Sequence, residues 1–175
     1  SIDYDDGAKD DDQWLYLPSL RKSTRISSSD KSGSFMGTDL SYADMTTRDP
    51  VDYTYKVLKQ DMKVGGESCW LIESKPKTAK AKRETGYLQS HVWISKDKMA
   101  PVMVKSWMAE GRRMKFIKFA DWKKLDGTWQ AHRILAQTKR GKEVESRTAI
   151  VFTSLEVNQA DVTERDFSQQ RLEQG

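Results

Sequence analysis

The sequence is poor in cysteine, histidine and proline, and it lacks a long hydrophobic run. Its 175 residues include one cysteine, two histidines and four prolines. The lone Cys69 excludes an intramolecular disulfide and any multi-cysteine metal site. His91 and His132 are too few for an ordinary zinc site unless carboxylates complete it. No hydrophobic stretch reaches the length of a membrane-spanning helix, and no signal peptide is recognisable.

The composition is polar and yet contains many aromatic residues. Hydrophobic residues make up 37% of the chain and charged residues 32%, and the mean hydropathy is -0.78. Disordered chains also have low hydropathy, but six Trp, six Tyr and five Phe argue against disorder. A sheet with one solvated face explains the composition better, because polar residues then fill alternate strand positions. The length predicts a single domain that can bury a core.

Charge is distributed unevenly along the chain, which has a net charge of +4 and a pI of about 9.0. Aspartates gather in residues 3–12, and basic residues gather in residues 75–83. The acidic segment departs from the spacing of a calcium-binding EF-hand loop, so a solvated turn is favoured. The basic segment has no aromatic residues on which bases could stack. A solvated loop between two strands is therefore favoured there over a phosphate-binding site.

Short apolar stretches separated by glycine turns predict a mainly β protein built as an antiparallel meander. The turns are expected at Gly65–Gly66, Gly111, Gly127 and Gly141. The pattern Ser41-x-x-Asp44 predicts one capped helical turn, and a second short helix is expected over residues 162–167. The expected strands are residues 13–17, 21–27, 53–60, 67–74, 88–95, 101–108, 112–120, 128–138 and 142–157.

Several expected strands carry apolar residues on both faces. Val92 and Ile94, for example, alternate with Trp93. An open sheet with one solvated face needs only one apolar set, so the second set must meet a helix, a sheet, a ligand or a partner. Core packing is the common explanation for each such residue. The sharper hypothesis is an apolar cavity for acyl chains. Its candidate lining residues are Trp70, Ile72, Trp93, Met103, Trp107, Met114 and Phe116.

Residues that could perform catalysis are scarce, and we expect neither an enzyme nor a cofactor. Cys69 could in principle pair with His91 or His132 as an activated nucleophile. Cys69 stands next to Trp70, however, and is better explained as a small buried hydrophobic residue. No glycine-rich phosphate-binding loop occurs, since Gly65–Gly66 fits a hairpin turn. We also expect no metal site.

Two segments carry a family resemblance, namely Trp14–Lys22 (WLYLPSLRK) and Phe35–Asp44 (FMGTDLSYAD). Together with weaker matches through most of the chain, they resemble the LolA-like family of outer-membrane lipoprotein-sorting proteins, in the branch associated with RND-type exporters. The resemblance implies a periplasmic protein with a curved antiparallel sheet, or half-barrel, and a few short helices. It implies that the apolar concave face shields lipid or lipoprotein acyl chains. Within the second segment, Gly37, Asp39 and Ser41 also fit a structural role in turns and caps.

The resemblance also shapes the expected organisation and partners. Family members usually have a further N-terminal region, so we expect residues 1–175 to form one LolA-like domain, the C-terminal portion of a longer precursor. An open sheet edge could then pair with a second copy of the chain. An RND-type membrane exporter is the expected protein partner, and nucleic acid is not an expected ligand. The alternatives are a lipid-responsive sensor on the same fold and a basic nucleic-acid-binding β domain.

Overall fold

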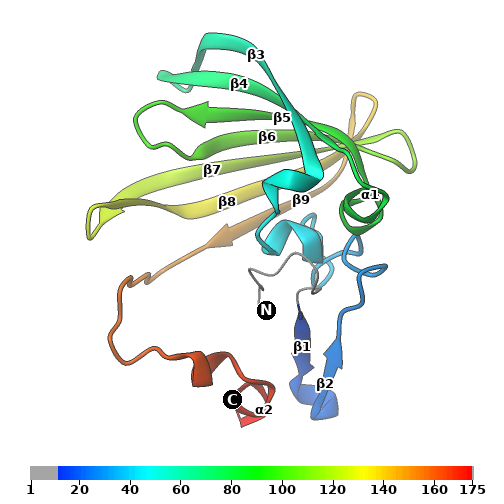
Figure 1. Ribbon diagram of the computed structural model, residues 1–175, viewed down its shortest axis with the longest axis vertical. Helices are drawn as coiled ribbons and strands as arrows, with labels where there is room; N and C mark the ends of the chain where they lie inside the picture. The colour runs from blue at the N-terminus through cyan, green and yellow to red at the C-terminus, as the bar shows by residue number, and fades with distance from the viewer. Residues whose placement is uncertain (1–11, 175) are drawn as a thin grey trace.

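A computed structural model describes residues 12–174 and shows a mainly β protein (Figure 1). Its main element is a seven-stranded antiparallel sheet in which the strands β3 to β9 lie in chain order. The sheet is not closed into a barrel. The predicted fold class, a mainly β protein with a curved antiparallel sheet and a few short helices, is therefore confirmed. The strands are β3 (Tyr53–Val64), β4 (Glu67–Pro76), β5 (Tyr87–Ser95), β6 (Pro101–Met108), β7 (Arg113–Leu125), β8 (Thr128–Arg140) and β9 (Glu143–Val151).

Tight turns explain why successive strands pair as a meander. The β3–β4 turn at Gly65 and Gly66 has positive φ angles at both residues, 59° and 89°. The β7–β8 turn at Asp126 and Gly127 likewise has φ angles of 45° and 81°. Two consecutive residues with positive φ match the right-handed twist of a hairpin, and glycine or aspartate adopts this backbone most readily. The hairpins predicted at these turns are confirmed.

The strand register divides the sheet into two faces, because successive side chains point to opposite sides. On one face, residues 57, 72, 92, 104, 117, 136 and 148 are aligned across the seven strands, and all of them except Thr148 on β9 are apolar. Residues 31–45 pack on this side, which we call the covered face. On the other side, which we call the open face, the neighbouring row aligns residues 56, 73, 91, 105, 116, 137 and 147.

Among the residues that the structure describes, each face holds one cluster of buried residues. On the covered face, Leu40 inserts against Ile117 and Ala136, with partly buried apolar residues around them. A second cluster contains Cys69, Leu71, Trp93 and Val102. In it the indole Nε1 of Trp93 lies 3.2 Å from the sulfur of Met62. On each face of the sheet, part of the predicted apolar set is therefore packed against other apolar residues.

The basic segment 75–83, which we expected to be a loop, instead contains the helix α1 (Ala79–Thr85). Thr78 is its N-cap, with its hydroxyl accepting a hydrogen bond of 3.1 Å from the backbone N–H of Ala81. Gly86 ends the helix with a φ of 66°, a conformation that favours glycine at this position. Ala81 and Thr85 are buried, so the basic side chains occupy the remaining, exposed side of the helix.

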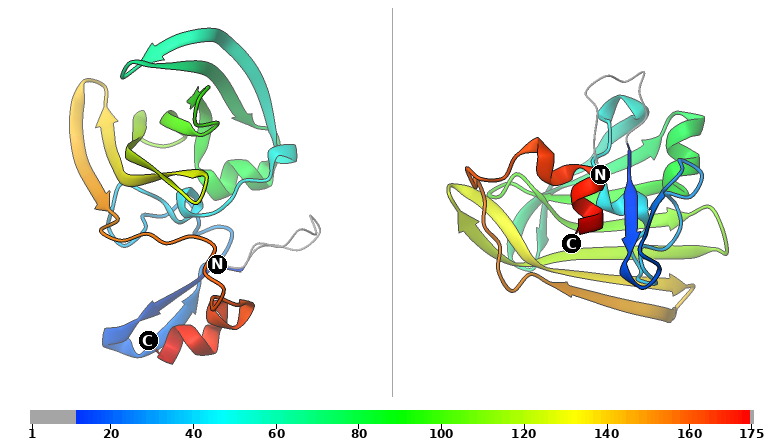
Figure 2. Two further views of the ribbon diagram at one scale, coloured as in Figure 1. Left: turned by 90° about the vertical axis from the view of Figure 1, so that its left-hand side faces the viewer. Right: turned by 90° about the horizontal axis from the view of Figure 1, so that it is seen from below.

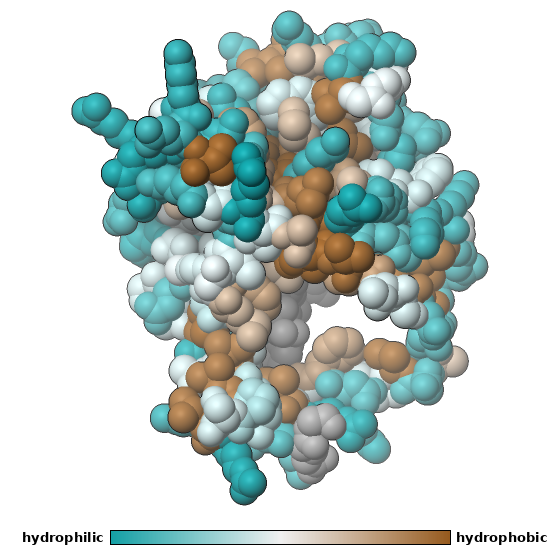
Figure 3. All heavy atoms as spheres, turned by 180° about the vertical axis from the view of Figure 1, so that it is seen from behind, coloured by the Kyte–Doolittle hydropathy of each residue, from teal (hydrophilic) through white to brown (hydrophobic). Residues whose placement is uncertain are grey.

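The two ends of the described chain meet below the sheet (Figure 2). The strands β1 (Trp14–Leu17) and β2 (Lys22–Arg25) form a hairpin around the 3-10 turn Pro18–Leu20. The chain leaves β9 at Val151, earlier than the predicted strand end at residue 157, and then forms η4 (Glu164–Phe167) and α2 (Gln169–Gln174). The helix α2 packs on the hairpin. Figure 3 shows a gap between this lower layer and the sheet.

In residues 12–174, no helix has both the length and the apolar character needed to cross a membrane.

Candidate functional site

Asp39 fixes the segment 31–45 to the sheet edge formed by β8 and β9. Its carboxylate accepts hydrogen bonds from the hydroxyls of Thr138 at 2.6 Å and Thr148 at 2.8 Å, and a short one from Ser146. Burial raises the pKa of Asp39, but the hydrogen bonds from the three hydroxyls outweigh it and lower the pKa below 3.8. The carboxylate is therefore held in its ionised form as an anchor for the loop.

Asp44 provides a second anchor, at the end of η2 (Tyr42–Met45). Its carboxylate accepts hydrogen bonds from Lys115 Nζ at 2.7 Å, the Tyr87 hydroxyl at 2.8 Å and the Ser41 backbone N–H at 2.9 Å. Burial raises the pKa of Asp44, whereas the charge of Lys115 and these hydrogen bonds lower it, with a net lowering. Burial and the neighbouring Asp44 carboxylate raise the pKa of Tyr87 well above 10.0.

These contacts give the signature segment 35–44 a structural role. The capping pattern predicted at Ser41 and Asp44 is confirmed, because the Ser41 hydroxyl also accepts from the Asp44 backbone N–H. The sequence pattern did not reveal the second partner, Lys115, which lies 71 residues further along the chain. Polar residues of the segment thus satisfy backbone groups and buried charges.

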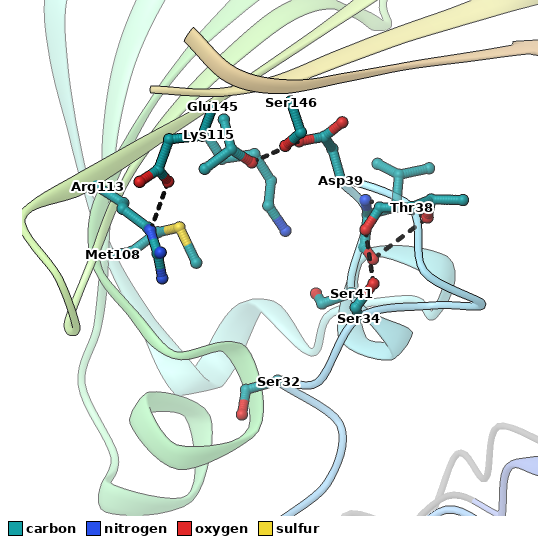
Figure 4. Close-up of a pocket in the computed structure, with 12 residues that line it drawn as sticks. Ser32, Ser34, Thr38, Asp39, Ser41, Met108, Arg113, Lys115, Glu145 and Ser146 are labelled. Atoms are coloured by element: carbon teal, nitrogen blue, oxygen red, sulfur yellow. Dashed lines mark hydrogen bonds and ion pairs between the residues drawn. The ribbon is translucent and has the colours of Figure 1, made fainter. Parts of the chain in front are cut away.

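A polar hollow of about 450 Å³ lies between this segment and the strands β6 to β9 (Figure 4). The cations that line it are already paired, since Arg113 donates to Glu145 at 2.6 Å and Lys115 donates to Asp44. Several lining hydroxyls are hydrogen-bonded too, since Thr138 and Ser146 donate to Asp39 and Ser34 donates to the Thr38 carbonyl. The hollow is therefore polar, and its hydroxyl oxygens keep acceptor capacity that suits a polar headgroup. The lining residues are Ser32, Ser34, Thr38, Asp39, Leu40, Ser41, Met108, Arg113, Lys115, Thr138, Glu145 and Ser146.

The covered face also has an apolar area beyond the Leu40 cluster, on β3, β4 and β5. The register aligns Val57 with Ile72 and Val92, and it aligns Trp70 with Ile94 in the next row. Val57 is 54% exposed, and the other four residues are partly buried. We call these five residues the apolar strip. Beside it runs a row of small hydroxyl residues in which the Ser90 and Ser106 hydroxyls lie 2.7 Å apart.

The structure divides the seven predicted cavity residues between the two faces. Trp70 and Ile72 lie on the covered face, within the apolar strip. The other five are aligned on the open face, where Trp93 belongs to the cluster around Cys69 and the rest are partly buried. They are Trp93, Met103, Trp107, Met114 and Phe116. One cavity cannot contain all seven, and the strip includes three residues that we did not predict, Val57, Val92 and Ile94.

The cysteine and the two histidines lie on different strands, with Cys69 on β4, His91 on β5 and His132 on β8. Cys69 is fully buried and pairs with Ser95, and burial raises the pKa of its thiol. His91 pairs with Glu73, and its ring contacts that of Trp107 at a centroid distance of 4.7 Å. In the described part of the chain, no group of three His, Cys, Asp or Glu side chains is placed to hold a metal ion. The acidic segment weighed as a calcium loop lies, apart from Asp12, outside the described residues.

Comparison with known proteins identifies the fold and the family. A family model with the description "uncharacterized protein" matches residues 2–174. A solved domain from Vibrio parahaemolyticus, assigned as an outer membrane lipoprotein-sorting protein, is 30% identical with a TM-score of 0.74. The alignment covers 94% of this chain and 67% of that one. The chain belongs to the LolA-like family of outer-membrane lipoprotein-sorting proteins. The suspected resemblance is thus confirmed.

Two further solved structures are similar to this LolA-like chain. A DUF1329 family protein from Desulfovibrio piger is 30% identical with a TM-score of 0.78, over 94% of this chain and 65% of that one. A LolA superfamily protein from Nitrosomonas europaea is 16% identical with a TM-score of 0.64, over 91% of this chain and 67% of that one, and shows the fold alone. The LolA-like chain thus spans about two thirds of the length of these structures. No curated protein matches it.

Proposed function

We propose that this LolA-like protein is a non-enzymatic, periplasmic carrier that shields lipid or lipoprotein acyl chains on the covered face of its sheet. One observation carries the proposal. The apolar strip remains partly exposed on the same face that residues 31–45 cover elsewhere. A soluble chain usually buries such adjacent apolar residues, unless they serve a ligand or a partner. Membership in a lipoprotein-sorting family supports an acyl ligand over other apolar partners.

The strip and the polar hollow suggest complementary roles on one face. The strip would contact the methylene groups of the chain, each contributing on the order of 0.8 kcal/mol when buried. The hollow would hold the polar end of the ligand by hydrogen bonds. The two cations that line the hollow, Arg113 and Lys115, are already paired and would add little charge attraction. Binding would therefore depend on apolar area and little on charge. Such a carrier releases its ligand readily, because it makes few directional contacts.

A fluorescent acyl probe tests the proposal. We expect the probe to bind with an affinity that changes little between low and high ionic strength, since screening acts on charges. Ile72→Glu should weaken binding, because it places an unpaired carboxylate in the strip. Met114→Glu is the matched control, since Met114 is also partly buried but lies on the open face beside Lys139.

Thermal unfolding of both variants separates lost binding from lost folding. The proposal predicts that both remain folded and that Ile72→Glu alone loses probe affinity. Equal affinities in the two folded variants would contradict it, as would the absence of any binding to the unmodified protein.

The proposed partners and organisation follow from the same account. We propose hand-over of the acyl ligand to or from an RND-type exporter, and one LolA-like domain over residues 1–175. No strand within residues 12–174 pairs with the outer edge of β3, which is twelve residues long and exposes Tyr55, Val57 and Leu58. This edge supports the proposal that a second copy of the chain could pair there.

A further inference from the structure

The open face of the sheet carries a concentration of positive charge. Three adjacent rows of its register, which lie within the described residues, contain many lysines and one acidic side chain, Glu73. Glu73 is already paired with Lys75 at 2.8 Å. The basic residues are Lys56, Lys59, Lys75, Lys105, Lys118, Lys139 and Arg147. Apart from Lys75, these residues have no acidic partner within the three rows, although the net charge of the whole chain is only +4.

Aromatic side chains lie between the charges. Lys105 Nζ lies 4.4 Å from the ring centroid of Trp107 and 5.5 Å from that of Phe116. Lys139 Nζ lies 5.3 Å from the same Phe116 ring. Neither Lys105 nor Lys139 forms an ion pair within residues 12–174. The rings hold the ammonium groups at the surface by cation–π attraction, and they add apolar area between them.

We propose that the open face docks on the surface of a membrane that contains anionic lipids. Lysine and arginine attract anionic headgroups, and Trp and Phe side chains favour the interface between headgroups and acyl chains. The open face combines both residue types on one broad sheet. The ligand of the proposed carrier would lie on the opposite side, so docking would leave the apolar strip accessible. This inference does not depend on acyl binding.

A vesicle co-sedimentation assay tests the docking surface. Vesicles of phosphatidylglycerol mixed with phosphatidylcholine should bind the protein at low ionic strength and release it at high ionic strength. Vesicles of phosphatidylcholine alone should bind much less. The double variant Lys118→Gln/Arg147→Gln should bind about tenfold or more weakly, since each basic side chain contributes about fivefold near an anionic surface. Both residues are exposed, so the variant should fold normally.

A matched variant removes the same charge elsewhere. Lys22→Gln/Lys82→Gln alters exposed residues of β2 and α1, outside the sheet, and should bind nearly as well as the unmodified protein. Trp107→Ala should weaken binding while the salt dependence of binding changes little, because the substitution removes an aromatic ring and no charge.

Equal losses in the two double variants would overturn the proposal, since net charge alone would then explain binding. Equal binding to vesicles of phosphatidylcholine alone would also overturn it. A duplex oligonucleotide that displaces the protein from the vesicles would assign the face to nucleic acid instead. The Ile72→Glu variant should still bind vesicles, so failure of the carrier proposal and failure of the docking proposal give different results.

Discussion

The carboxylate of Asp44 and the ammonium group of Lys115 lie 2.7 Å apart, and both side chains are almost completely buried. The pair joins η2 to the first residues of β7, across 71 residues of chain. Tyr87 and Ser41 complete the hydrogen bonds of the carboxylate. The contact therefore fixes the position of the segment that covers one face of the sheet.

Removing one charge of this pair should destabilise the protein strongly. Asp44→Asn leaves Lys115 buried without its partner, which costs about 3–5 kcal/mol of unfolding free energy. Urea denaturation measures this change. The double variant Asp44→Asn/Lys115→Met should recover part of the loss, because no buried charge remains unpaired. If Asp44→Asn alone unfolds at the same urea concentration as the unmodified protein, the pair does not hold the segment.

The two anchoring carboxylates predict a loss of stability in acid. The folded-state pKa values of Asp39 and Asp44 lie below the ordinary value of 3.8. Their ionised forms therefore stabilise the native state above about pH 3.8, and this contribution is lost as the pH falls through the folded-state pKa values. Urea denaturation as a function of pH measures the slope. The double variant Asp44→Asn/Lys115→Met should show a smaller slope, and an identical slope would assign the acid sensitivity to other groups.

Cys69 should react slowly with a thiol reagent in the native protein. Its side chain is fully buried, and burial raises the pKa of its thiol, so little thiolate is present or accessible. The rate should rise sharply in denaturant. Ellman's reagent measures both rates under the same conditions. Equal rates in native and denaturing conditions would show that the cluster around Cys69 opens freely. The thiol would then again be a candidate reactive group.

Turn chemistry made much of the sheet predictable. Gly65–Gly66 and Asp126–Gly127 adopt the positive φ angles that hairpins need, and the strands between the turns appear where apolar residues recur. The strand ends were less accurate, because twisted strands continue through polar residues, as β7 does to Leu125. The helix α1 was missed although Thr78 and Gly86 were present as cap signals. A run of basic residues also fits a solvated loop, so the local sequence does not decide between the two structures.

The candidate site could be predicted only in part, because its membership depends on register. A shift of one residue moves every side chain of a strand to the other face, and single-sequence reasoning does not fix it. Leu58 shows the difficulty, since a register shift between Val57 and Lys59 leaves it without a paired residue on β4. Consequently Trp70 and Trp93, which both looked suited to a cavity, lie on opposite faces. Long-range contacts such as Asp39 with Thr148 leave no local signal in the sequence.

The central claim is that acyl chains bind on the covered face. Photochemical cross-linking tests this claim most directly. A fatty acid with a diazirine on its acyl chain would be irradiated with the protein, and tandem mass spectrometry would assign the modified residues. Because faces alternate along β5, the method distinguishes Val92 and Ile94 from His91 and Trp93. We predict adducts on Ile72, Val92 and Ile94 that excess unlabelled fatty acid abolishes. Adducts on Trp107 and Phe116 instead, or labelling that competitor does not reduce, would contradict the account.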